Sequence, residues 1–163
     1  MHALIEQLEQ SLGNGMLITF IISMVPVAEL RLAIPVGVSL GLHPWVAMLV
    51  SVCGNMVPVP FIILFIRRIF AWMRRHIPRL EGLVTRLERR AEGKSAAINK
   101  YELIGLAVFV AIPLPGTGAW TGALIAALMN LRLKTAVPSI FLGVIIAGFL
   151  VTGLTFGFQA IFS

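Results

Sequence analysis

The chain has 163 residues, of which 58% are hydrophobic and only 12% are charged, and its mean hydropathy is +0.95. Soluble domains carry about a quarter charged residues, so this composition excludes an ordinary soluble domain and predicts a single integral membrane domain. The net charge of +6 does not indicate a nucleic-acid partner, because ten of the 13 basic residues fall in one block between Arg67 and Lys100.

The composition also argues against a metal site, a cofactor or a disulfide. The chain has one cysteine, and its three histidines lie far apart in the sequence. The N-terminal sequence "MHALIEQLEQ" is acidic and lacks the basic start and short apolar core of a cleavable signal peptide. We therefore expect the first apolar segment to be retained as part of a multi-pass protein of the cytoplasmic membrane.

The first half of the chain contains apolar segments that are too short to cross a bilayer. Residues 14–25 lead to a break at Pro26, and a second segment, 32–42, returns from it. A helix needs about 20 residues to span the hydrocarbon core, so this pair predicts a re-entrant hairpin. Residues 44–66 then form one crossing, kinked at Pro58 and Pro60. Residues 10–28 are uncharged and long enough to span alone, which remains the alternative.

The basic block, residues 67–101, is predicted to be a cytoplasmic loop by the positive-inside rule. Within it, apolar residues recur at helical spacing among arginines. These apolar positions are Leu80, Leu83, Val84, Leu87 and Ala91. The pattern indicates a basic amphipathic helix on anionic lipid, and a solvated linker is the alternative.

The second half repeats this plan around the sequence "IPLPGTGAW". Residues 103–131 lack charge, and Pro113 and Pro115 interrupt any straight helix through them. The sequence predicts two half-helices, 102–112 and 119–131, that form a second re-entrant hairpin. Residues 136–160 form the other crossing.

Aligning Pro26 with Pro113 gives the same order of elements in both halves, in opposite membrane orientations. We therefore predict an all-α membrane protein with an inverted repeat of a re-entrant hairpin and a crossing helix. The first repeat covers residues 10–66 and the second covers residues 102–163. Inverted repeats with broken helices are a transporter architecture.

Glu29 and Arg31 lie between Pro26 and Pro35, the prolines expected to break the first hairpin. Each charge costs about 2.5–3.5 kcal/mol at the centre of a bilayer, so such residues usually face a protein interior or a wet cavity. On a helix they would point in different directions, whereas an unwound tip would let both face one site. Glu29 then accepts a proton or cation, and Arg31 binds a phosphate or carboxylate. Alternatively, the two charges only pair across the hairpins and hold the fold together.

The second hairpin supplies further candidate substrate-binding residues at its break. These are Gly116, Thr117, Gly118, Trp120 and Thr121. Free backbone groups and the N-terminus of a half-helix suit an anion, while the glycines equally favour close packing of helices. Asn55 in the first crossing is a further candidate, although an intramembrane amide more often bonds a neighbouring helix.

The segments "AELRLAIPVGVSLG" (28–41) and "IPLPGTGAWTGALIAALMNL" (112–131) resemble the small multidrug export proteins, distant relatives of the DedA membrane proteins. The resemblance covers nearly the whole chain and implies a transporter. Its first signature would be Glu29, Arg31, Pro35 and Gly37. Its second signature would be Pro113, Pro115, Gly116, Gly118 and Gly122. The DedA relatives imply transfer of phosphate-bearing lipid carriers such as undecaprenyl phosphate.

The sequence thus predicts a proton-coupled transporter or flippase for a drug-like molecule or a lipid carrier phosphate, with its site between the two hairpins. Membrane lipid and a second copy of the chain are the expected partners. A small cationic-drug efflux protein and a non-transporting membrane scaffold remain alternatives. The sequence contains no nucleophile–base pair or metal-ligand spacing, so we expect no enzymatic chemistry.

Overall fold

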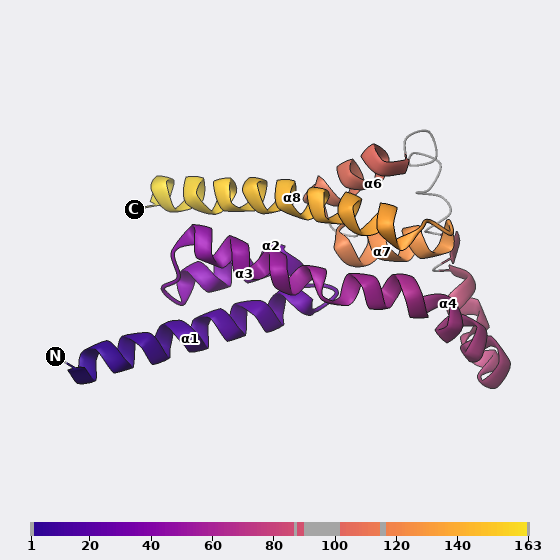
Figure 1. The fold of residues 1–163 in the computed structure, drawn as a ribbon, viewed down its shortest axis with the longest axis horizontal. Coiled ribbons are helices and arrows are strands. Elements are labelled where there is room, and N and C mark those ends of the chain that lie inside the picture. The colour runs from indigo at the N-terminus through magenta and orange to yellow at the C-terminus, as the bar shows by residue number, and fades with distance from the viewer. Residues whose placement is uncertain (1, 87, 90–101, 115–116, 163) are drawn as a thin grey trace. The chain divides into compact units, whose positions relative to one another are not determined.

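A computed structural model describes residues 2–86, 88–89, 102–114 and 117–162, and all regular structure in these residues is helical (Figure 1). The elements in chain order are α1 (His2–Met24), α2 (Glu29–Ser39), α3 (Pro44–Met56), α4 (Pro58–His76), the 3-10 helix η1 (Pro78–Leu80), α6 (Glu102–Ala111), α7 (Ala119–Leu128) and α8 (Leu133–Phe162). Residues 81–86 are also helical. The predicted all-α class is confirmed.

The first half folds as helix, break and helix, but α1 begins at His2 and has 23 residues, whereas the predicted short segment began at residue 14. The break covers residues 25–28 around Pro26, and α2 begins at Glu29, three residues before the predicted start. Glu29 and Arg31 therefore lie in the first turn of a helix and not in an unwound tip. The predicted break at Pro35 is wrong, because Pro35 lies inside α2. Buried residues on both sides of Pro35 hold the helix against its neighbours despite the lost backbone donor.

The first crossing is interrupted at Val57, as the kink predicted at Pro58 requires. Helix α3 ends at Met56, and α4 begins with Pro58 as its first residue, where a proline costs no hydrogen bond. Helix α4 continues ten residues beyond the predicted end at residue 66. Its last turn carries Arg74, Arg75 and His76, and basic side chains suit the negative end of the helix dipole.

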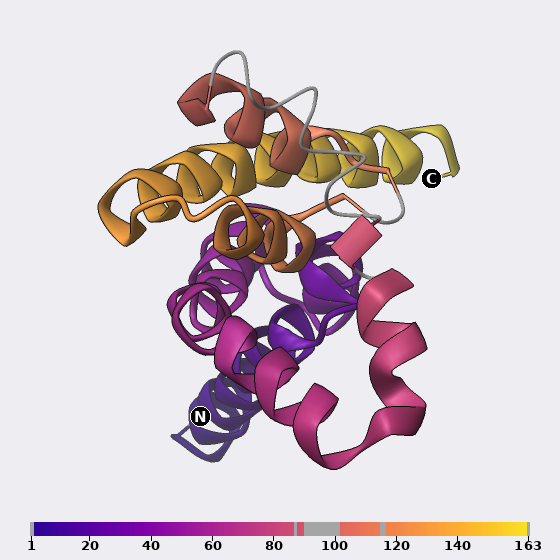
Figure 2. The same ribbon diagram turned by 90° about the vertical axis from the view of Figure 1, so that its right-hand side faces the viewer.

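The basic block doubles back after α4, because the chain turns at η1 and enters the helical segment 81–86 (Figure 2). Arg74 donates a hydrogen bond to the Glu88 carboxylate across this turn. Val84 is buried and Leu83 is half exposed, so the described part has one covered face and one open face. Leu87, Ala91 and the rest of the predicted amphipathic helix lie outside the described residues.

The second half contains the two predicted half-helices, α6 and α7, and the break between them. Pro113 lies in that break, whereas Pro115 and Gly116 lie outside the described residues. Helix α8 follows as one helix of 30 residues, slightly longer than the predicted crossing 136–160. Residues 103–131 therefore do not form one continuous helix.

The chain divides into two compact units. One boundary falls between α3 and α4 and the other falls within α8, so each unit contains part of α8. Unit 1 comprises residues 1–57 and 145–163, so it contains α1, α2, α3 and the second part of α8. Helices α1, α2 and α3 pack against one another in pairs (Figure 1). Gly148 of α8 lies over Met48 and Val52 of α3. The rings of Trp45 and Phe149 meet edge to face, 5.8 Å between centroids.

Unit 2 comprises residues 58–144, so it contains α4, η1, α6, α7 and the first part of α8. Helix α7 packs against both α4 and α6. A Cβ atom placed on Gly122 of α7 would meet Val110 of α6 at 2.6 Å and Ile140 of α8 at 3.7 Å. The N-terminal part of α8 therefore shares a core with the helix pair that precedes it.

The turn that joins α2 to α3 in unit 1 recurs between α7 and α8 in unit 2, 89 residues further along the chain. Each turn closes a short helix with three backbone hydrogen bonds and one residue of positive φ, Gly41 in unit 1 and Asn130 in unit 2. The bonds are Leu40 N to Val36 O, Gly41 N to Val38 O and Leu42 N to Gly37 O, and then Met129 N to Ile125 O, Asn130 N to Ala127 O and Leu131 N to Ala126 O. Helices α3 and α8 begin at equivalent positions, 44 and 133.

A second contact recurs in both units. Helix α3 contacts α1 in unit 1 in the same way as α8 contacts α6 in unit 2. A Cβ atom on Gly54 of α3 would lie 2.6 Å from the carbonyl oxygen of Phe20 in α1. A Cβ atom on Gly143 of α8 would lie 2.5 Å from the carbonyl oxygen of Ala107 in α6. The glycines are again 89 residues apart, but their partners are 87 apart. The chain between these equivalent contacts is therefore two residues longer in the second half than in the first.

We predict that Gly54→Ala and Gly143→Ala each destabilise the protein, because neither site has room for a methyl group against a backbone carbonyl. We expect a loss of about 1–3 kcal/mol for each variant, as for other overpacked cores. Melting temperatures in detergent would measure it. Gly153→Ala is the control, since no atom lies within 4 Å of its added Cβ. Equal melting temperatures for all four proteins would contradict the shared contact.

Candidate functional site

Glu29 and Arg31 form an ion pair within the first turn of α2. Arg31 Nη1 lies 3.8 Å from Glu29 Oε2, and the exposed fractions of the two side chains are 22% and 5%. Residues two positions apart on a regular helix would not face each other. The pair forms because Glu29 has a φ of +47°, so its side chain leaves the backbone in a different direction from that of a regular helical residue.

The backbone of Glu29 is unusual for a residue with a side chain. Positive φ values are uncommon outside glycine and carry a conformational cost of about 1–3 kcal/mol, which concentrates at functional sites. The equivalent position in unit 2, 89 residues further on, is Gly118, whose φ is +137°. Glycine suits this position in one repeat, whereas the other repeat keeps a carboxylate there despite the cost.

Helix α3 contributes two buried polar residues to unit 1, Ser51 and Asn55. They are four positions apart, so both lie on the same face of the helix. Their exposed fractions are 0% and 1%. Neither the Ser51 hydroxyl nor either amide atom of Asn55 has a hydrogen-bond partner within the described residues. The interhelical hydrogen bond favoured for Asn55 is therefore not formed, and each unpaired group costs about 1–3 kcal/mol.

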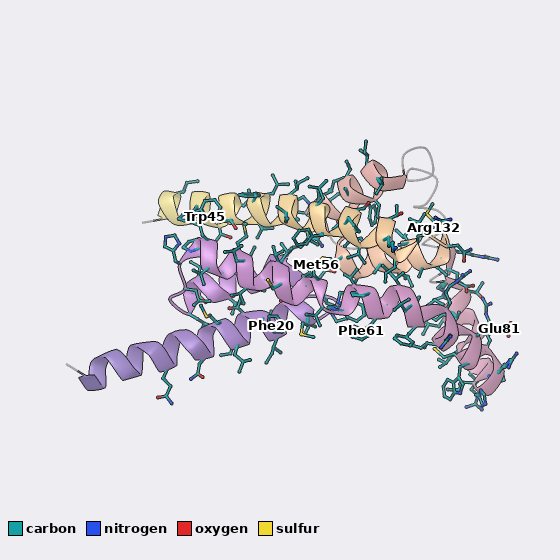
Figure 3. All side chains as sticks on the ribbon, in the orientation of Figure 1. Phe20, Trp45, Met56, Phe61, Glu81 and Arg132 are labelled. Carbon is teal, nitrogen blue, oxygen red and sulfur yellow. The ribbon has the colours of Figure 1, made fainter. Side chains whose placement is uncertain are left out.

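The contacts of Gly37 set the register between α2 and α3. A Cβ atom on Gly37 would lie 3.0 Å from the Ala47 side chain. A short turn joins the two helices, so they run antiparallel. Counting eight residues back from Gly37 and eight forward from Ala47 brings Glu29 level with Asn55. Figure 3 labels Trp45 at one end of α3 and Met56, the neighbour of Asn55, at the other. Glu29 and Asn55 thus share the end of unit 1 that lies away from Trp45.

Helix α1 adds Ser23 at the same level. Its hydroxyl lies against Gly54, next to Asn55, and donates a hydrogen bond to the carbonyl of Phe20 at 2.6 Å. The three helices of unit 1 therefore each place a buried oxygen at one end of the unit. We call Ser23, Glu29, Ser51 and Asn55 the polar layer.

The candidate residues of the second hairpin belong to unit 2. The Thr117 hydroxyl contacts the carbonyl oxygens of Ile112 and Leu114 at 2.6 and 2.7 Å, so it closes the break locally. Gly118 is buried directly before α7, and Trp120 and Thr121 in its first turn are partly buried. Gly122, one turn into α7, makes a close contact within this hairpin, because its added Cβ would meet Val110 of α6. Gly116 lies outside the described residues.

Sequence reasoning missed Ser23 and Ser51. Serine is common in apolar helices, so neither residue stands out in the sequence. The four-residue spacing of Ser51 and Asn55 becomes informative only when the structure shows that their face of α3 packs against α2. Within the described residues no group of three or more His, Cys, Asp or Glu side chains is placed to hold a metal ion. The polar chemistry of the candidate site therefore rests on the Glu29 carboxylate, the Arg31 guanidinium and neutral hydroxyl and amide groups.

The helices expose large apolar side chains that a soluble surface would avoid. Leu17, Leu49, Phe61 and Leu154 have exposed fractions of 58%, 60%, 61% and 67%. The segments Pro44–His76 and Leu133–Gly157 are long and apolar enough to cross a membrane. These surfaces match a lipid environment, in which only the polar groups need to be enclosed.

Comparison with known proteins gives one match. The chain matches the family described as Putative small multi-drug export protein over residues 29–150, which is more than half of its length and runs from the start of α2 into α8. No curated protein and no solved structure matches the chain. The family and the apolar helices together identify a membrane protein. The chain belongs to the small multi-drug export protein family.

Proposed function

We propose that the chain is a membrane transporter or flippase whose working charges are Glu29 and Arg31. The observation that carries this proposal is a buried carboxylate beside a partly exposed guanidinium, held in the first turn of a short helix in a strongly apolar chain. Such charges cost about 2.5–3.5 kcal/mol each at the centre of a bilayer. A functional role accounts for that cost, and the family description supports export.

Arg31 is the residue that meets the substrate in this proposal. Its side chain is 22% exposed, whereas Glu29 is almost fully enclosed. A guanidinium presents a planar fork of donors that matches a phosphate or carboxylate. The substrate is accordingly an amphipathic molecule with an anionic head group, such as a lipid carrier phosphate. Glu29 takes up the coupling proton or cation.

The membrane arrangement follows from the distribution of charge. The helix pairs α1–α2 and α6–α7 enter the bilayer as re-entrant hairpins of an inverted repeat, and the basic segment 67–101 lies in the cytoplasm. Membrane lipid surrounds the exposed apolar side chains. A homodimer provides more helices around the transport path than one copy has.

We predict that Glu29→Gln lowers transport in proteoliposomes at least about tenfold, because the amide has no negative charge to balance a bound cation and cannot change its protonation state. Uptake or flipping of a fluorescent polyprenyl phosphate or a cationic dye under a pH gradient would measure the loss. The matched control is Glu81→Gln, the same change at an exposed carboxylate of the basic segment. Full transport by Glu29→Gln would refute the role given to Glu29.

Substitution of Arg31 separates an anionic from a cationic substrate. If Arg31 holds a phosphate or carboxylate, Arg31→Ala abolishes transport, and Arg31→Lys retains part of it as a point charge. The same assay with a lipid phosphate and with a cationic drug compares the two classes. Unchanged transport of the cationic drug with lost stability would favour an efflux protein in which Arg31 only supports the fold.

Cysteine accessibility tests the re-entrant arrangement. In a Cys53→Ser background we expect Lys100→Cys and Arg132→Cys to react with a membrane-impermeant maleimide from the same side of the membrane. Arg89→Cys in the basic segment is the reference for the cytoplasmic side. Labelling of residues 100 and 132 from opposite sides would show that 103–131 crosses the membrane.

A further inference from the structure

The repeat offers an internal comparison for the polar layer. The positions 89 residues beyond Ser51 and Asn55 are Ile140 and Val144, both fully buried in unit 2. The position 87 residues beyond Ser23 is Val110, which is 1% exposed. The repeated glycine contacts establish both offsets. Unit 2 thus shares the turn and the close glycine contact of unit 1 but has apolar side chains at these three positions, where unit 1 has oxygen-bearing ones.

The fold itself therefore does not require the polar layer. Apolar residues at these positions bury their surface without any unpaired donor or acceptor, whereas Ser51 and Asn55 are buried and have no hydrogen-bond partner in the described residues. Unpaired buried polar atoms of this kind are explained by a water, an ion or a ligand that binds there. The difference between the two repeats marks unit 1 as the one that carries a ligand.

We propose that the polar layer binds a sodium ion, with the Glu29 carboxylate, the Ser51 hydroxyl, the Asn55 side-chain oxygen and the Ser23 hydroxyl as its oxygen ligands. Hard cations take carboxylate, carbonyl and hydroxyl oxygens. Every member of the layer is less than 5% exposed, so the occupant is small and sheds most of its water. The Glu29 charge compensates that of a monovalent ion.

A sodium ion at this site also changes the charge interactions of Arg31. A cation beside Glu29 neutralises the carboxylate that otherwise attracts the guanidinium 3.8 Å away. Arg31, the more exposed of the two, then has its full charge available for an anionic head group. Cation and anion thus bind together with no net charge added to the apolar interior. This inference rests on the proposed function, in which Glu29 is the ion-binding residue.

The test is the melting temperature of the purified full-length chain in detergent, with sodium chloride exchanged for potassium or choline chloride at constant ionic strength. A ligand that binds only the folded state raises apparent stability. We expect a rise of about 5 °C in saturating sodium and little change in potassium. Identical melting temperatures of the wild-type chain in all three salts would overturn the sodium site.

Two variants remove the neutral ligands on α3. Asn55→Val reproduces Val144 and Ser51→Ala removes the second neutral ligand, and we expect both to fold and to lose the sodium-dependent shift. The matched control is Thr152→Val, because Thr152 is a buried unpaired hydroxyl of unit 1 on α8. It should keep the full shift. A sodium shift that survives Asn55→Val and Ser51→Ala would place the ion elsewhere and refute these ligands.

Titration of the wild-type chain with sodium by calorimetry keeps the test decisive even where a variant does not fold. Saturable binding supports the site, and its absence overturns it. The result is separable from the transport assays. A chain that transports without responding to sodium retains the proposed function and refutes the site. A chain that binds sodium at the layer but moves no substrate retains the site and refutes transport.

Discussion

A buried carboxylate is the constraint on which the chemistry of this protein depends. Glu29 is held at the start of α2 in a backbone conformation that favours glycine, and its side chain is almost fully enclosed. In an apolar chain, such a group stays ionised only with a positive partner and suitable dipoles around it. Arg31 supplies the charge, and the polar atoms of α1 and α3 lie at the same level. Glu29, whose charge is the most costly to bury, is thereby surrounded by the few groups able to stabilise that charge.

The repeat shows how one packing scheme carries two different interiors. In each unit a glycine on the third helix lets it contact the backbone of the first, and the same turn joins the second helix to the third. These features are backbone contacts, so they leave the neighbouring side chains free to differ. Unit 2 has apolar side chains at Val110, Ile140 and Val144, whereas unit 1 has hydroxyl and amide groups at the equivalent positions.

Much of the helical plan was predictable from the sequence. Prolines and glycines determine where a helix stops, and the breaks at Pro26 and Pro113 lie where their lost donors predicted. Pro35 behaved differently because buried neighbours held α2 together, a tertiary effect that local propensity does not contain. The pairing of Glu29 with Arg31 depended on one positive φ value, and the polar layer depended on the register of α2 against α3. Neither has a signal in a single sequence without the fold.

The division of the long helices between the two units bears on biosynthesis. Unit 1 contains the first 57 residues and also the chain from Ile145 onward, so its core takes elements from both ends of the polypeptide. As the ribosome delivers the chain, α1, α2 and α3 are made before unit 2, while the α8 residues that cover Met48 and Val52 are made after it. All of unit 2 is synthesised in between. The face of α3 that carries Met48 and Val52 is therefore uncovered until these α8 residues follow, and lipid or the insertion machinery has to shield it in the meantime.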